Sequence, residues 1–194
     1  LWGPTGRWVV LDATFAVRQG SLSSRIAYSQ LAGALGVELG ERVPERELRE
    51  AVLELRRSKG MVLDGADHDT WSAGSFFTNP VLTQEQADKL PSEAPRFEVT
   101  DHSMIVGTRP APVVPGLVKT SAAWLIQHAG FGPGFALDDA APASLSTVHV
   151  LAITNRGNAS AADIEALAKT VIAGVRDKYG LTLVPEPVRV GLDF

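Results

Sequence analysis

The chain alternates between two hydrophobic periods, one typical of strands and one typical of helices. Within residues 7–17, apolar side chains occupy every second position from Val9 to Val17, which predicts a half-buried strand that needs a sheet to join. Apolar positions recur at helical spacing over residues 44–59 and 160–180. Gly60 and Gly180 are expected to end these two helices, because glycine readily adopts the backbone conformation at the end of a helix.

Helix-start signals add two further helices. Thr83 with Gln86, and Ser160 with Asp163, have the spacing of a capping box, in which two side chains satisfy each other's backbone N–H groups. The first pair predicts a short helix after Thr83, and the second supports the start of the long C-terminal helix. Another helix is expected over residues 121–128.

Apolar segments flank the long C-terminal helix. Residues 147–154 are apolar on both faces, which predicts a central strand. Residues 181–184 predict a second strand, with a continuation near residues 188–190. Because strand-rich and helix-rich segments are mixed along the chain, we predict an α+β fold.

A polar, glycine-containing stretch without periodicity, residues 60–71, separates the first long helix from the rest of the chain. We therefore divide the chain into residues 1–70 and residues 71–194. The chain opens on Leu1 rather than methionine and enters a predicted strand almost at once, so we expect it to start within a larger protein.

Composition narrows the class of protein. With 194 residues, 45% of them hydrophobic and 21% charged, the chain is typical of a globular protein with a sizeable core. A net charge of -4 argues against a nucleic-acid partner, since such proteins usually carry a basic excess. The absence of cysteine excludes disulfides, thiolate metal sites and a cysteine nucleophile. The longest uncharged stretch, residues 120–137, contains polar residues and glycines, so we expect a helix and a loop rather than a membrane span.

The segment Gly-Ser-Phe-Phe-Thr-Asn-Pro over residues 74–80 places a hydroxyl beside two aromatic rings. In a site that excludes water, Ser75 suits a hydrogen-bond donor or general acid, and Asn79 offers a ligand both a donor and an acceptor. The alternative is a turn whose two phenylalanines anchor it to the core. Residue types alone favour that alternative.

A rigid carboxylate stands near the C-terminus. Glu186 lies between Pro185 and Pro187, which restrict the backbone and remove two donors, so the segment is expected to be extended at a sheet edge or beyond it. Such a carboxylate suits general acid or base chemistry, or stabilisation of an enol. A solvated edge residue is the alternative.

Two lysines and one histidine are further candidates. Lys119 precedes a predicted helix and suits a phosphate, because a helix N-terminus also favours an anion. Lys59 suits a phosphate too, although complementing the dipole at a helix C-terminus explains it equally well. His149 begins an otherwise apolar strand, where a satisfied, half-buried histidine is the alternative.

The run of Asp64, Asp67, His68 and Asp69 invites a metal interpretation. It lacks the spacing of an EF-hand, and the chain contains no His-Glu-x-x-His motif. We therefore predict no metal site and interpret the run as a solvated loop.

Ser75, His149 and Glu186 also have the residue types of a hydrolase triad. The Gly-x-Ser-x-Gly motif is absent, and chain order is no evidence of contact. A failure of Ser75 to react with an activated fluorophosphonate would exclude this option.

Five segments together resemble, in order and spacing, the family of UDP-N-acetylenolpyruvoylglucosamine reductases, also called UDP-N-acetylmuramate dehydrogenases. The resemblance covers nearly the whole chain, and Gly-Ser-Phe-Phe-x-Asn-Pro is its most specific part. The segments are residues 26–31 around Tyr28, 56–59, 74–80, 119–126 and 185–187.

The resemblance implies a fold and a reaction. Residues 1–70 would be the end of an FAD-binding α+β domain of the PCMH type, and residues 71–194 a small α+β substrate-binding domain with an antiparallel sheet and packed helices. In the family, FAD takes a hydride from NADPH and passes it to the enolpyruvyl double bond of UDP-N-acetylglucosamine-enolpyruvate, making UDP-N-acetylmuramate for peptidoglycan. We expect a cytoplasmic monomer with no nucleic-acid partner and no membrane insertion.

The resemblance also implies roles for individual residues. Ser75 matches the serine that protonates the carbanion or enol left by hydride addition, and Glu186 matches the acid that works with it. Positions that hold the UDP-sugar match Tyr28, Lys59, Asn79 and Lys119, and His149 falls where the family places a polar residue on the substrate side.

Part of the family pattern has no counterpart in these residues: the N-terminal half that supplies most of the FAD-binding surface, and the arginine of a Tyr-Arg-x-Ser motif. The resemblance therefore implies that this chain is the substrate-binding portion, inactive alone, with most FAD-binding residues elsewhere. A function of another class remains open, namely a non-catalytic module that binds a UDP-sugar without the flavin half.

Overall fold

The structure, a computed structural model, describes residues 10–17, 19–101 and 111–188. The chain forms two compact units, Leu1–Val62 and Leu63–Phe194. The division lies inside the polar stretch of residues 60–71. The assignment of residues 1–70 to a flavin-binding domain and of residues 71–194 to a substrate-binding domain stays a prediction.

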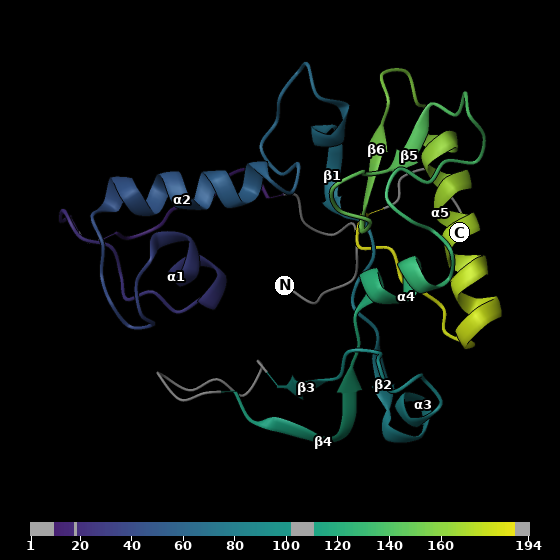
Figure 1. The fold of residues 1–194 in the computed structure, drawn as a ribbon, viewed down its shortest axis with the longest axis horizontal. Helices are drawn as coiled ribbons and strands as arrows, with labels where there is room; N and C mark the ends of the chain where they lie inside the picture. Colours follow the sequence, from purple (N-terminus) through teal and green to yellow (C-terminus); the bar gives the residue numbers. More distant parts are fainter. Residues whose placement is uncertain (1–9, 18, 102–110, 189–194) are drawn as a thin grey trace. The chain divides into compact units, whose positions relative to one another are not determined.

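Unit 1 contains, among its described residues, the helices α1 (Ser29–Leu35) and α2 (Glu45–Arg57) (Figure 1). The sequence pattern predicted α2 but not α1. Acidic side chains in the first turn of α2 and basic ones in its last turn complement the helix dipole. Ile26, Ala32 and Val43 form a small buried cluster against which Leu48 of α2 packs.

The strand predicted over residues 7–17 is wrong for the part that the structure describes. Residues 10–17 adopt no regular secondary structure, and the side chains of Leu11, Phe15 and Val17 are exposed. The described part of unit 1 contains no strand to pair with this segment, so the alternation has no sheet to face. Residues 7–9 lie outside the described residues.

Unit 2 builds all the sheet structure of the described residues, as two three-stranded antiparallel sheets in the strand orders β1-β6-β5 and β2-β4-β3. The α+β class predicted from the sequence is therefore confirmed. The elements of unit 2 are η1 (His68–Thr70), β1 (Ser72–Ser75), β2 (Val81–Thr83), α3 (Gln84–Asp88), β3 (Phe97–Thr100), β4 (Val113–Lys119), α4 (Ala122–His128), β5 (Ala143–Leu145), β6 (Ala152–Asn155) and α5 (Ala161–Tyr179).

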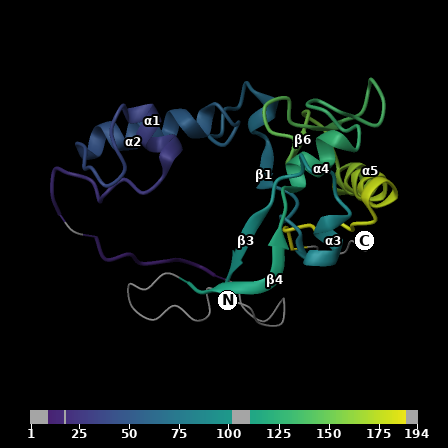
Figure 2. The ribbon, with the colours of Figure 1, turned by 60° about the horizontal axis from the view of Figure 1, so that its bottom comes forward.

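Helices cover both sheets of unit 2. Figures 1 and 2 show α5 alongside the β1-β6-β5 sheet, where it contacts β5 and β6, and α3 next to β2 and β4. Both predicted capping boxes are present, at Thr83 for α3 and at Ser160 for α5. Ser121 caps α4 by accepting the backbone N–H of Trp124, and Gly180 ends α5 in the left-handed conformation. Among the residues with described coordinates, no helix combines the length and the apolar character needed to span a membrane.

The strand predicted over residues 147–154 is half right. Its C-terminal part is β6, the central strand of its sheet, as the apolar character of both faces indicated. Residues 147–151 instead form the β5–β6 turn. The buried hydroxyl of Ser146 closes this turn by accepting the backbone N–H groups of Val148 and His149 at 3.1 and 3.2 Å.

The strand predicted over residues 181–184 does not form. Leu181 and Leu183 are buried, but the only strand-like pairing here among described residues is one isolated bridge between Phe77 and Pro185. Prolines cannot donate to a ladder, which stops the pairing from extending. Of the continuation predicted near residues 188–190, the last two residues lie outside the described residues.

One close contact in the core of unit 2 yields a stability prediction. A Cβ atom added at Gly174 in α5 would lie 2.4 Å from two ring carbons of Phe131. Gly174→Ala gains about 1 kcal/mol of helix propensity, but overpacking costs roughly 1–3 kcal/mol, so we expect a net loss of stability. Urea unfolding measures it, with Ala173→Gly as a control that removes propensity without a clash. A stabilised Gly174→Ala would show that the Phe131 ring moves aside freely.

Candidate functional site

The Gly-Ser-Phe-Phe-Thr-Asn-Pro segment connects the two sheets of unit 2. Ser75 is the last residue of β1, and Val81 is the first residue of β2 in the other sheet. Phe76 and Phe77 are both buried in the core, with their rings in edge contact at 5.1 Å between centroids. The anchored turn considered as an alternative is therefore present, and it fixes the backbone on either side of the rings.

Ser75 and Glu186 lie on neighbouring backbone segments. Ser75 pairs with Ala152 of β6, and the next residue, Phe76, accepts the backbone N–H of Glu186 at 2.8 Å. The extended conformation predicted for the Glu186 segment is thus tied to the motif by backbone hydrogen bonds. Within the described residues, neither the hydroxyl of the half-buried Ser75 nor the carboxylate of the exposed Glu186 has a side-chain partner.

Asn79 and Lys119 come together at the other end of the motif. Val81 of β2 pairs with Lys119 of β4, and Thr120 donates its backbone N–H to the carbonyl of Pro80 at 3.0 Å. Asn79 Oδ1 accepts the backbone N–H of Ala122 at 2.9 Å and so caps the start of α4. Among the described residues no hydrogen bond engages its Nδ2 group, which could therefore donate to a ligand.

Lys119 is half-buried and, in the part of the chain that the structure describes, forms no ion pair. The other described lysine of this region, Lys89, is exposed and paired with Glu85 at 2.9 Å. A half-buried lysine that has no carboxylate partner is well suited to bind an anionic ligand.

His149 lies in the β5–β6 turn and not in a strand, which corrects the sequence analysis. The turn returns to the motif, because Leu151 accepts the backbone N–H of Phe76 at 2.7 Å. Five candidate residues of unit 2 are thus carried by segments that bond to residues 75–81. They are Ser75, Asn79, Lys119, His149 and Glu186.

Tyr28 and Lys59 line one hollow of unit 1, with a volume of about 470 Å³. Lys59 Nζ donates to Gln30 Oε1 at 3.1 Å, and Arg56 lines the same hollow. Gln30 was missed by sequence reasoning, because α1, on which it lies, was not predicted.

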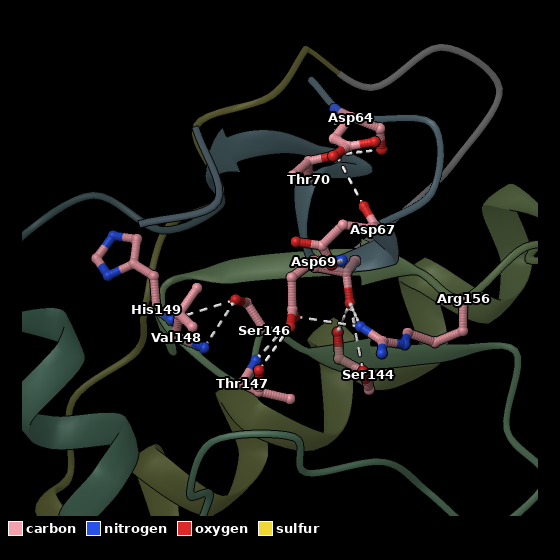
Figure 3. Close-up of polar contacts among 11 residues, drawn as sticks. Asp64, Asp67, Asp69, Thr70, Ser144, Ser146, Thr147, Val148, His149 and Arg156 are labelled. Carbon is pink, nitrogen blue, oxygen red and sulfur yellow. Dashed lines mark hydrogen bonds and ion pairs between the residues drawn. The ribbon is translucent and has the colours of Figure 1, made fainter. Parts of the chain in front are cut away.

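Asp69 corrects the interpretation of residues 64–69 as a solvated loop. Its side chain is only 13% exposed. Asp69 accepts the backbone N–H and the hydroxyl of Thr147 at 2.9 and 2.5 Å, and pairs with Arg156 at 3.1 Å (Figure 3). Burial by itself raises the pKa of the Asp69 carboxyl, but the hydrogen bonds from Thr147 and Ser146 and the Arg156 charge outweigh it and hold that pKa below its ordinary value.

The described polar residues form neither a metal-binding cluster nor a hydrolase triad. Across the described residues, no group of three or more histidine or acidic side chains is arranged to hold a metal ion. No hydrogen bond joins the side chains of Ser75, His149 and Glu186, so the described geometry offers no hydrolase triad.

Comparisons with known proteins fit this architecture of an α+β domain whose motif joins two small sheets. Residues 66–190 match the sequence profile of a family described as "UDP-N-acetylenolpyruvoylglucosamine reductase, C-terminal domain". The chain therefore belongs to the UDP-N-acetylenolpyruvoylglucosamine reductase family, as the resemblance of its motifs implied.

Relatives named UDP-N-acetylenolpyruvoylglucosamine reductase are similar to nearly the whole chain. The protein of Cutibacterium acnes is 55% identical over 185 residues, which is 95% of this chain and 45% of the relative. The protein of Mycobacterium sp. (strain MCS) is 51% identical over 94% of this chain and 49% of the relative. That of Streptomyces avermitilis is 49% identical over 97% of this chain and 50% of the relative. The chain thus spans about half the length of these relatives.

Proposed function

We propose that this chain is the substrate-binding portion of a UDP-N-acetylmuramate dehydrogenase, which reduces UDP-N-acetylglucosamine-enolpyruvate with NADPH and FAD in peptidoglycan precursor synthesis. Membership of the family supports the reaction class. The observation that supports this site is the backbone pairing of residues 76–77, next to Ser75, with residues 185–186: Phe76 accepts the backbone N–H of Glu186, and Phe77 bridges to Pro185. A cytoplasmic location and a monomeric state are part of the proposal.

In this proposal, Ser75 and Glu186 supply the proton that completes reduction of the enolpyruvyl group. Hydride addition to the enolpyruvyl double bond leaves a carbanion or enol, and one proton must reach the remaining carbon to complete the lactyl ether. Ser75 donates that proton from its hydroxyl, and Glu186 acts with it at the enolpyruvyl end. Both side chains lack protein partners among the described residues, so both are available to a substrate.

Asn79, Lys119 and His149 bind the substrate in this proposal, as do Tyr28 and Lys59 in unit 1. Lys119 is half-buried without a carboxylate, which suits the diphosphate of a UDP-sugar. The exposed ring of Tyr28 offers a flat apolar face beside Lys59 in the hollow of unit 1.

FAD supplies the hydride in this family reaction, but the described residues of unit 1 do not fit a complete flavin-binding domain. They form two helices and no sheet, while residues 10–17 expose a row of apolar side chains. We therefore assign no flavin contact to the residues of this chain. FAD and NADPH are proposed for the complete reading frame that contains it.

The experiment that tests the function follows NADPH absorbance with the complete reading frame and FAD, with and without UDP-N-acetylglucosamine-enolpyruvate. Oxidation of NADPH that depends on the sugar nucleotide supports the reductase. Binding of the sugar nucleotide without flavin binding or turnover would instead support the UDP-sugar-binding module. Turnover that ignores the sugar nucleotide would contradict the reductase and favour the UDP-sugar-binding module.

Lys119→Ala is expected to raise KM for the sugar nucleotide by about tenfold or more while changing kcat little. A phosphate contact of this kind exists in both the ground state and the transition state, and a charge-assisted hydrogen bond contributes about 1.5–3 kcal/mol. Steady-state kinetics measure both constants. Lys89→Ala, which removes an exposed lysine paired with Glu85, is the matched control and should leave KM unchanged. An unchanged KM for Lys119→Ala would remove Lys119 from the site.

A further inference from the structure

The loop before β1 is tied to the β5–β6 turn by one carboxylate. Both carboxylate oxygens of Asp69 accept hydrogen bonds from Thr147. Oδ1 accepts the backbone N–H of Thr147, and Oδ2 accepts the Thr147 hydroxyl. These two residues lie 78 positions apart in the sequence. Figure 3 shows Asp69 pointing between Thr147, which lies in the turn before β6, and Arg156, which directly follows β6.

Asp69 is itself held in place. Asp67 Oδ1 accepts the backbone N–H of Asp69 at 2.9 Å, which caps the short helix η1. Immediately after η1, Trp71 accepts the backbone N–H of Asn155 at 2.9 Å, so the loop is attached to β6 independently. Asp69 therefore acts from a fixed position.

The turn that Asp69 holds leads directly to the candidate site. From Thr147 the chain passes His149 and reaches Leu151, whose carbonyl accepts the backbone N–H of Phe76. Phe76 follows Ser75 and accepts the backbone N–H of Glu186. A shift of the turn at Thr147 would thus move His149 and disturb the backbone that sets Ser75 against Glu186.

We propose that Asp69 is a positioning residue of the substrate site, which fixes the β5–β6 turn through Thr147 and thereby places His149 and the Ser75 backbone for the enolpyruvyl substrate. This inference rests on the proposed function. Asp69 touches no substrate and takes no part in proton transfer; its effect passes through Thr147.

The test compares variants of the complete reading frame that break or keep the contact between Asp69 and the Thr147 hydroxyl. Asp69→Asn replaces one accepting oxygen by an amide donor, and Thr147→Val removes the hydroxyl without changing the branched shape. Thr147→Ser keeps the hydroxyl. Asp64→Asn is the matched control, because it makes the same change of charge in the same loop and its carbonyl oxygen can still accept the backbone N–H of Ala66.

Two kinds of measurement are made on each variant. Steady-state kinetics give KM and kcat for the enolpyruvyl substrate, and stopped-flow absorbance gives the rate of flavin reduction by NADPH without that substrate. Asp69→Asn and Thr147→Val should each raise KM about five- to tenfold, because both lose the bond between the Thr147 hydroxyl and the Asp69 carboxylate. Asp69→Asn also weakens the pairing with Arg156, so the double variant should be little worse than Asp69→Asn alone. Flavin reduction should not change. Thr147→Ser and Asp64→Asn should stay near wild type.

Three results would overturn the proposal. An unchanged KM with a lowered melting temperature would make Asp69 a structural tie only. A parallel loss of flavin reduction would indicate general damage to the protein. Unchanged amide exchange of Val148 and His149 in Asp69→Asn, measured by hydrogen–deuterium exchange on this chain, would show that the turn does not depend on Asp69. Failure of the wild-type protein to reduce the enolpyruvyl substrate would instead contradict the proposed function, and the exchange measurement would still decide whether Asp69 fixes the turn.

Discussion

Ser75→Ala is expected to slow the reoxidation of reduced flavin by UDP-N-acetylglucosamine-enolpyruvate by about 10²–10⁴-fold, the usual contribution of a positioned general acid. The reduction of flavin by NADPH should stay nearly intact, because only the second half-reaction needs a proton at the substrate carbon. Stopped-flow absorbance of the complete reading frame measures the two half-reactions separately.

The structure provides a control for this variant. Ser72→Ala removes a hydroxyl from the same strand, where it accepts the backbone N–H of Gly74 at 3.2 Å. If Ser72→Ala slows reoxidation as much as Ser75→Ala, the cause is a disturbed strand rather than a lost proton donor. Equal losses in both half-reactions of Ser75→Ala would also contradict the assigned role.

Helix positions could be predicted from the sequence because their signals are local. The hydroxyls of Thr83, Ser121 and Ser160 each accept a backbone N–H from within the next three residues, so the signal and the structure occupy the same few positions. The left-handed Gly180 at the end of α5 is equally local. The same reasoning missed α1, whose first residue comes after Tyr28 without any side-chain cap.

The sheets were predicted less well because strand pairing is not local. β1 and β2 have four and three residues, too few to show a period of two. The register that brings Val81 opposite Lys119 depends on residues far apart in the chain. Conversely, the pattern of residues 7–17 predicts a strand, but its described part, residues 10–17, has no strand to pair with among the described residues of unit 1.

The candidate site divides in the same way. Ser75, Asn79 and Glu186 could be named from the sequence because each stands in a short, unusual string of residues. The second role of Asn79, as a cap for α4, depends on an N–H group 43 residues away and could not be foreseen. The contact between Asp69 and Thr147 has no local sequence signal either. The sequence around Asp69 therefore could not distinguish a buried, hydrogen-bonded carboxylate from a solvated one.

Phe77→Ala is expected to destabilise unit 2 by about 3–5 kcal/mol, the usual cost of truncating a buried phenylalanine. The Phe77 side chain is only 1% exposed and belongs to the main core cluster. Phe97, in β3 of the same unit, is 51% exposed, so Phe97→Ala removes an identical ring at a cost of roughly 0.5 kcal/mol or less and serves as the control.

The measurement is hydrogen–deuterium exchange at the amides of Leu167 and Val171, because both lie in α5 and report on unit 2 alone. The backbone of Phe77 also bridges to Pro185, so loss of the ring that anchors this backbone should speed amide exchange at Glu186 more than at α5. Faster exchange at Glu186 than at α5 would show that the Phe77 side chain stabilises both the core and the backbone pairing that holds Glu186 next to the Ser75 segment. If Phe77→Ala costs no more than Phe97→Ala, the backbone bonds alone hold the motif, and the two aromatic rings are not what fixes the site.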